Sequence, residues 1–188
     1  MVSLAFTTAL LVVTLGVIWV RLSGQARQLM AAVIVRGTVI ALIAIAAYDL
    51  SRGILAWFDP SPFDPYAALP IFGALLVGVN APPWLIWTAG IGFHLLNGVA
   101  FGLAYAFVFG RLAVRSLKWA LVTGVGWGLF LETFQLTLYP GWLNITTYKE
   151  FVTISFLGHI VYGLVLGALG HRWLPWPADS DTPAGSDE

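Results

Sequence analysis

Cysteine is absent from the 188-residue chain, and charged residues make up only 10% of it. The lack of cysteine excludes disulfides, thiolate metal ligands, iron–sulfur clusters and cysteine nucleophiles. Soluble domains carry about 25% charged residues, so this chain has too few charges to cover a water-facing surface. Because 59% of the residues are hydrophobic, the lipid bilayer is the expected surrounding. The formal net charge is zero, which gives no basic field for nucleic acid.

Long apolar runs predict an all-α fold, a polytopic membrane helix bundle. A spanning helix needs about 20 mostly apolar residues, and the runs of this kind cover residues 3–20, 29–58, 84–110, 119–139 and 151–170. We therefore expect five transmembrane helices. Residues 1–173 would form a single bundle domain, followed by a polar, acidic and disordered tail at 174–188. The first run lacks a preceding positive charge and a cleavage site, so we expect it to be retained as a helix.

Residues 68–79 are apolar but too few to cross a hydrocarbon core of about 30 Å, which predicts a short re-entrant or interfacial helix on the outer side. With five spans, Arg21, Arg27, the stretch Arg111–Lys118 and Arg172 share one face. The positive-inside rule makes that face cytoplasmic. A multi-pass protein of the cell membrane is expected, with its N-terminus outside and its C-terminus in the cytoplasm. His171 would lie at the inner surface. The low lysine content and the acidic tail favour a prokaryotic source.

Two predicted helices share the pattern His-x-x-x-Gly-x-x-x-Gly, which starts at His94 and at His159. Glycine at every fourth position forms a flat stripe against which another helix backbone can pack closely. Gly124 and Gly128 form a similar stripe in line with Glu132. We expect these stripes to be packing surfaces and both histidines to point at neighbouring helices.

Four ionisable residues on four helices fall at one depth, which the rise of an α-helix places about 11 to 15 Å below the outer ends. They are Asp49, His94, Glu132 and His159. Ionisable groups in mid-membrane are costly and mark functional sites. Each is followed three residues later, on the same helix face, by a polar side chain. These four residues are Arg52, Asn97, Gln135 and Tyr162. The sequence therefore predicts one buried polar site in the outer half of the bilayer.

The leading interpretation of this site is a divalent metal centre. Two imidazoles and two carboxylates suit zinc, iron or manganese, and Asn97, Gln135 and Tyr162 would orient the ligands. Such a metal could activate water or oxygen against a lipid-like or small substrate. Whether the protein is an enzyme stays open.

Three alternatives remain. In a proton- or ion-coupled transporter or channel component, Asp49 and Arg52 would form a structural ion pair, and Glu132 would relay protons with the histidines. A haem between the histidines, with Gly98 and Gly163 making room, is a less favoured cofactor. Finally, the residues could form a hydrogen-bond network in a structural subunit. The short chain and its glycine stripes are compatible with a homo-oligomer or a membrane-complex partner.

The segment from Gly128 to Pro140 resembles the Glu-x-x-Gln segment of the teicoplanin-resistance-associated membrane family. Leu157 to Gly167 resembles small, uncharacterised prokaryotic membrane families with a His-x-x-Tyr/Phe-Gly-x-x-x-Gly helix. These resemblances imply a membrane bundle and name no activity. The chain departs from the first family because no Asp-Lys pair precedes His94.

Overall fold

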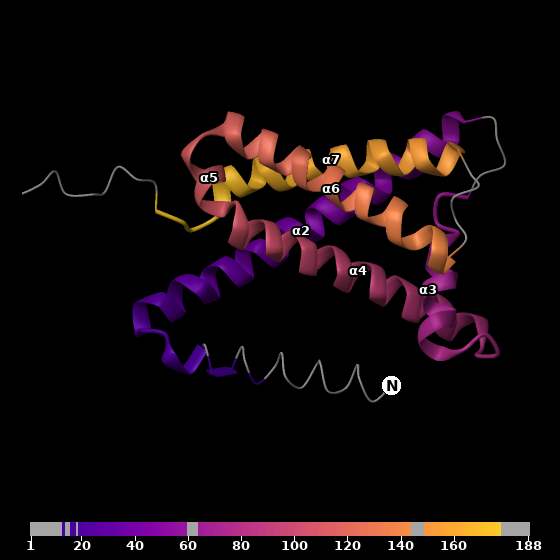
Figure 1. The fold of residues 1–188 in the computed structure, drawn as a ribbon, viewed down its shortest axis with the longest axis horizontal. Helices are drawn as coiled ribbons and strands as arrows, with labels where there is room; N and C mark the ends of the chain where they lie inside the picture. Colours follow the sequence, from indigo (N-terminus) through magenta and orange to yellow (C-terminus); the bar gives the residue numbers. More distant parts are fainter. Residues whose placement is uncertain (1–12, 14–15, 18, 60–63, 144–148, 178–188) are drawn as a thin grey trace, which may run out of the picture.

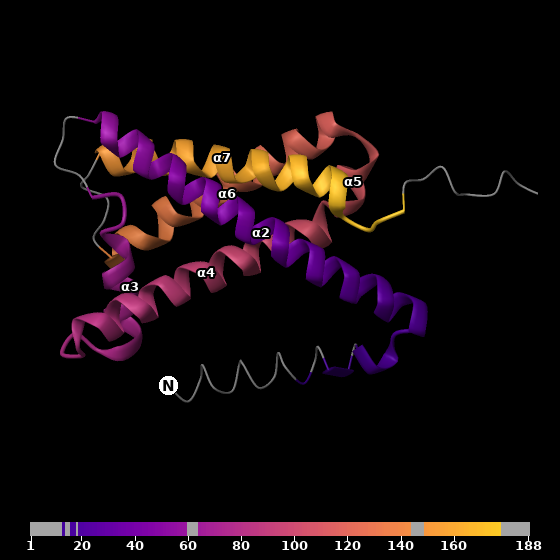
Figure 2. The same ribbon diagram turned by 180° about the vertical axis from the view of Figure 1, so that it is seen from behind.

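The structure is a computed structural model that describes residues 13, 16–17, 19–59, 64–143 and 149–177. These residues form helices without any strand (Figures 1 and 2), which confirms the all-α prediction. The elements are α2 (Gly24–Phe58), α3 (Ala68–Val77), α4 (Pro83–Val108), α5 (Gly110–Arg115), α6 (Leu117–Leu143) and α7 (Lys149–Trp173). The helix expected at residues 3–20 lies largely outside the described residues.

Among the described residues, three helices are long and apolar enough to cross a membrane, namely α2, α4 and the Thr153–Trp173 part of α7. The 27 residues of α6 extend for about 40 Å at the rise of an α-helix. By contrast, α3 has ten residues and covers about 15 Å. The expected short helix is therefore present, and it is too short to span.

The long α2 runs diagonally through the bundle (Figures 1 and 2), packing against α7 and α4. Its buried residues recur every three or four positions and so lie along one helix face. They include Val33, Ile40, Ala44 and Tyr48. Each neighbour of α2 contacts one further helix: α7 packs against α6, and α4 packs against α3.

The glycine stripes are packing surfaces, as predicted. A Cβ atom at Gly124 would collide with the Gly163 carbonyl, and a Cβ at Gly163 would collide with the Gly124 carbonyl. On α4, a Cβ at Gly98 would lie 2.6 Å from the Ile45 side chain of α2. The absence of side chains at these glycines therefore lets α6 lie close to α7 and α4 lie close to α2.

Three boundaries differ from the sequence-based expectations. Residues 110–115 form α5, because Ala113 is buried against the bundle and the chain turns only at the extended Ser116. Helix α6 continues through Pro140 to Leu143, since a proline near a helix end removes only one backbone hydrogen bond. Residues 174–177 were assigned to the tail, but Leu174 is buried and Trp176 donates a hydrogen bond to the Ala106 carbonyl. The rest of that tail, 178–188, lies outside the described residues.

Candidate functional site: a polar cavity between two histidine–carboxylate pairs

The first pair joins α2 to α4. The Nε2 atom of His94 lies 3.0 Å from Oδ2 and 3.2 Å from Oδ1 of Asp49. A carboxylate only accepts hydrogen bonds, so Nε2 carries the ring proton and Nδ1 is left for other contacts. Arg52, one turn further along α2, places Nη1 3.9 Å from Asp49 Oδ1. Asp49 thus has a permanent cation and a titratable imidazole beside it.

The second pair joins α6 to α7. The Nδ1 atom of His159 lies 2.9 Å from Glu132 Oε2 and 2.9 Å from the Ser155 carbonyl oxygen. Because the carbonyl only accepts, Nδ1 carries a proton, and Nε2 is the remaining ring nitrogen. The Ser155 hydroxyl also donates to Glu132 Oε2, at 2.8 Å. Glu132 is only 2% exposed, and within the described part of the chain its Oε1 atom has no hydrogen-bond partner.

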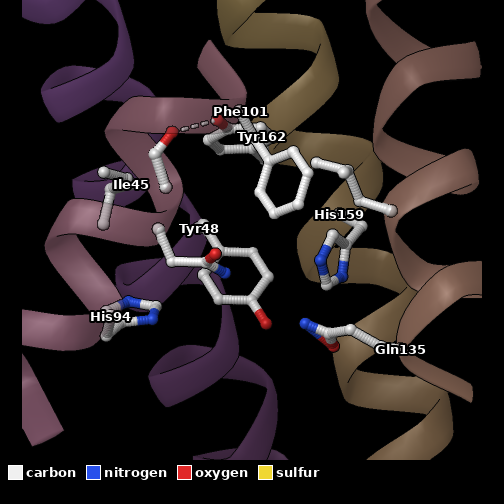
Figure 3. A pocket seen from close by; sticks show the side chains of 10 residues that line it. Ile45, Tyr48, His94, Phe101, Gln135, His159 and Tyr162 are labelled. Atoms are coloured by element: carbon white, nitrogen blue, oxygen red, sulfur yellow. Dashed lines mark hydrogen bonds between the residues drawn. The ribbon is translucent and has the colours of Figure 1, made fainter. Parts of the chain in front are cut away.

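Tyr48 of α2 separates the two pairs (Figure 3). Its ring centroid lies 6.1 Å from that of His94 and 4.9 Å from that of His159. The rings of Tyr48 and His159 meet edge to face, so the tyrosine packs directly against the second pair. The sequence predicts one site for all four ionisable residues, whereas the structure arranges them as two pairs around a tyrosine.

No group of three or more histidine, aspartate or glutamate side chains able to hold a metal occurs among the described residues. The predicted ligand set of Asp49, His94, Glu132 and His159 is therefore not assembled as one cluster here. Metal binding itself stays a prediction. The space beside the glycines expected to make room for a haem is filled by other residues. Gly98 faces the Ile45 side chain, and Gly163 faces the Gly124 backbone.

Both histidines line a cavity of about 70 Å³, which has room for on the order of five water molecules. Its other polar lining residues are Tyr48, Asn97, Gln135 and Tyr162. The Tyr162 hydroxyl is used structurally, donating to the Gly98 carbonyl at 2.8 Å, as the dashed line in Figure 3 marks. The amides of Asn97 and Gln135, in contrast, make no hydrogen bond to any residue that the structure describes. These two amides are therefore available to form hydrogen bonds with a molecule bound in the cavity.

Arg52 links the first pair to the segment before α3. Its guanidinium donates to the Pro65 carbonyl and lies 4.8 Å from the Tyr48 ring centroid. The Tyr66 hydroxyl donates to the backbone carbonyl of Asp49 at 2.8 Å. These contacts fix the end of α2 and hold Asp49 in place.

Two residues of the site were missed from the sequence, Tyr48 and Ser155. Ser155 precedes His159 by one helical turn and so shares its face, a spacing that could have identified it. Tyr48 carried no such signal, because it belongs to a residue type that is common in apolar helices. His171 lies apart from the cavity, as expected, with Nδ1 2.9 Å from the Ala113 carbonyl.

No protein-family model matches the chain, and no curated protein or solved structure matches it either. The resemblance of residues 128–167 to small membrane families stays a prediction. The site itself presents two imidazoles, each in contact with a carboxylate, at a small polar cavity.

Proposed function

We propose that the chain is a multi-pass membrane protein in which the two histidine–carboxylate pairs bind and transfer protons, as in a proton-coupled transporter or channel component. The observation that carries this proposal is the use of one ring nitrogen of each histidine by a carboxylate, Nε2 of His94 and Nδ1 of His159. Such contacts fix the tautomer and the orientation of an imidazole. The opposite nitrogen of each ring can then exchange a proton with water in the cavity.

Charge balance supports proton binding at the second pair. Asp49 lies beside Arg52, so the first pair is neutral when His94 is uncharged. The cation that Glu132 contacts is His159, whose charge depends on its protonation. An uncompensated carboxylate in an apolar surrounding costs several kcal/mol, so Glu132 and His159 are expected to hold one proton between them. The His94–Asp49 pair can bind or release one further proton.

A flux measurement tests this function. The full chain would be reconstituted into vesicles that contain a pH-sensitive dye, and a potassium diffusion potential would drive protons across the membrane. We expect a faster internal pH change than in protein-free vesicles. His94→Gln and His159→Gln should each slow it by roughly tenfold or more, as when a barrier rises by about 1.4 kcal/mol. His171→Gln is the matched control and should conduct like the wild type. Equal rates in wild-type and empty vesicles would contradict the proposal.

A divalent metal at the cavity is the second candidate. A carboxylate behind each imidazole is the arrangement that commonly orients metal-binding histidines, and it occurs at His94 and at His159. Elemental analysis of the purified protein tests this candidate for zinc, iron or manganese. Stoichiometric metal that is lost from either histidine variant would support it. A metal-free protein that still conducts protons would contradict the metal site and support the proton relay.

For the topology we propose five spans, formed by a helix before residue 24 together with α2, α4, α6 and α7, with α3 outside. The support is the arginine distribution and the shortness of α3. Since the chain has no cysteine, single cysteines can be introduced at Ala67, just before α3, and at Ser116, between α5 and α6. An impermeant thiol reagent should label Ala67→Cys from outside and Ser116→Cys from inside. Labelling from the same side would contradict the five-span arrangement.

A further inference from the structure

The cavity lies between two helices that are supported from different sides. Helix α4 packs against α2 and α3, whereas α6 packs against α5 and α7. They meet where Trp127 Nε1 of α6 donates to the Phe101 carbonyl of α4 at 3.1 Å, with their ring centroids 6.5 Å apart. Beyond this contact, Asn97 on α4 and Gln135 on α6 line the cavity and are partly exposed. The cavity is therefore accessible from the side, between α4 and α6.

An aromatic row on α6 runs beside this opening. The rings of Trp127 and Phe130 are stacked at 5.3 Å, and those of Phe130 and Phe134 lie 6.3 Å apart. Phe130 is 52% exposed and Phe134 is 43% exposed. The next residues along α6, Leu131 and Gln135, line the cavity. A polar cavity thus adjoins an apolar strip on the same helix, which suits a molecule with a small polar head and one apolar chain.

The polar end of this site would favour a single negative charge. When both histidines are protonated, the groups in the two pairs comprise three cations and two carboxylates, which leaves one net positive charge. The Asn97 and Gln135 amides, without partners in the described part of the chain, can donate to an oxyanion. A carboxylate has few enough atoms for a cavity of about 70 Å³.

We infer that the cavity binds the headgroup of a single-chain carboxylic acid, such as a long-chain fatty acid, whose alkyl chain leaves between α4 and α6 along Phe130 and Phe134. The charge argument rests on the histidine protonation of the proposed function, whereas the amides and the aromatic row are independent of it. Such an acid would be the substrate class of the proton-coupled site.

Photo-crosslinking tests the inference. The full chain in vesicles would be exposed to a palmitic acid probe with a diazirine in mid-chain, and crosslinked peptides would be mapped by mass spectrometry. We expect crosslinks concentrated on α4 and on the Phe130–Phe134 strip of α6. Unlabelled palmitate should compete, whereas methyl palmitate, palmityl alcohol and butyrate should not. Asn97→Leu and Gln135→Leu should each reduce the yield by roughly tenfold, the effect of losing about 1.4 kcal/mol of binding energy.

Gln28→Leu, an exposed amide near the start of α2, is the matched control and should leave the yield unchanged. Crosslinks spread evenly over the apolar faces, or undiminished in both cavity variants, would overturn the inference. Equal competition by methyl palmitate or the alcohol would overturn the carboxylate headgroup, and equal competition by butyrate would overturn the role of the chain. Proton flux without specific crosslinking would refute the lipid site alone, and specific crosslinking without flux would refute the relay alone.

Discussion

His159 Nδ1 lies 2.9 Å from Oε2 of Glu132, and this contact forms where α6 and α7 approach most closely through glycine. A Cβ at Gly128, one turn before Glu132, would collide with the carbonyl of His159 itself. The backbone of the histidine is therefore positioned by the glycine, and its ring by the glutamate. Packing and chemistry depend on the same interface.

Removing the histidine should leave the glutamate protonated. In His159→Gln, the carboxylate of Glu132, only 2% exposed, loses its cation and takes up a proton to avoid the cost of a buried charge. Infrared spectroscopy at neutral pH should then show a new carboxylic acid band. The band should be absent from the double variant His159→Gln/Glu132→Gln. An unchanged spectrum in the single variant would mean that another cation compensates Glu132.

Gly163→Ala should destabilise the bundle. The new methyl group would meet the carbonyl of Gly124 on the facing helix, and overpacking of this kind costs about 1 to 3 kcal/mol. The control is Gly126→Ala on α6, where a Cβ meets nothing within 4 Å. That variant should unfold like the wild type or slightly later, because alanine favours a helix. Unfolding in mixed detergent micelles, followed by circular dichroism, measures both. Equal stability of the two variants would contradict the close α6–α7 packing.

Several features of the bundle could be predicted from the sequence, because regular spacing of residues along one helix is a local signal. The glycines at every fourth position, the short helix before α4 and the common depth of the ionisable residues all follow from helix geometry. The division into two pairs could not be predicted, since it depends on how α2 is rotated between α4 and α7. That rotation places Tyr48 between the histidines. Helix rotation is set by contacts between distant residues, which spacing along one helix does not reveal.

Arg52→Met should destabilise the fold more than Asp49→Asn does. Methionine retains the apolar part of the side chain but loses the hydrogen bond to the Pro65 carbonyl and the contacts with Asp49 and Tyr48. Losing a hydrogen bond made by a buried charged group costs about 1.5 to 3 kcal/mol. The Asp49 side chain is 30% exposed, so its neutralisation should cost about 1 kcal/mol or less. Denaturant titration of both variants checks this order, and a reversed order would show that Asp49 is the main anchor.

Trp176→Phe should weaken the attachment of the chain segment after α7. The indole Nε1 donates to the Ala106 carbonyl at 2.9 Å, and losing one such hydrogen bond costs about 0.5 to 1.5 kcal/mol. Trp84→Phe is the matched control, because Trp84 is 68% exposed. In thermal unfolding, Trp176→Phe should have a lower melting temperature than Trp84→Phe. Equal stability of the two variants would contradict a role for the Trp176 hydrogen bond.

The pairing of Glu132 with a histidine on the following helix has a consequence for biogenesis. During synthesis α6 leaves the ribosome before α7, so Glu132 reaches the insertion machinery before its partners Ser155 and His159 do. A lone ionised carboxylate at mid-helix adds about 2.5 to 3.5 kcal/mol to the cost of insertion. Helix α6 therefore has to enter with Glu132 protonated or together with α7 as a hairpin. Chains in which a soluble reporter domain replaces residues 149–188 should consequently integrate α6 less efficiently than the full chain, and Glu132→Gln should remove the difference.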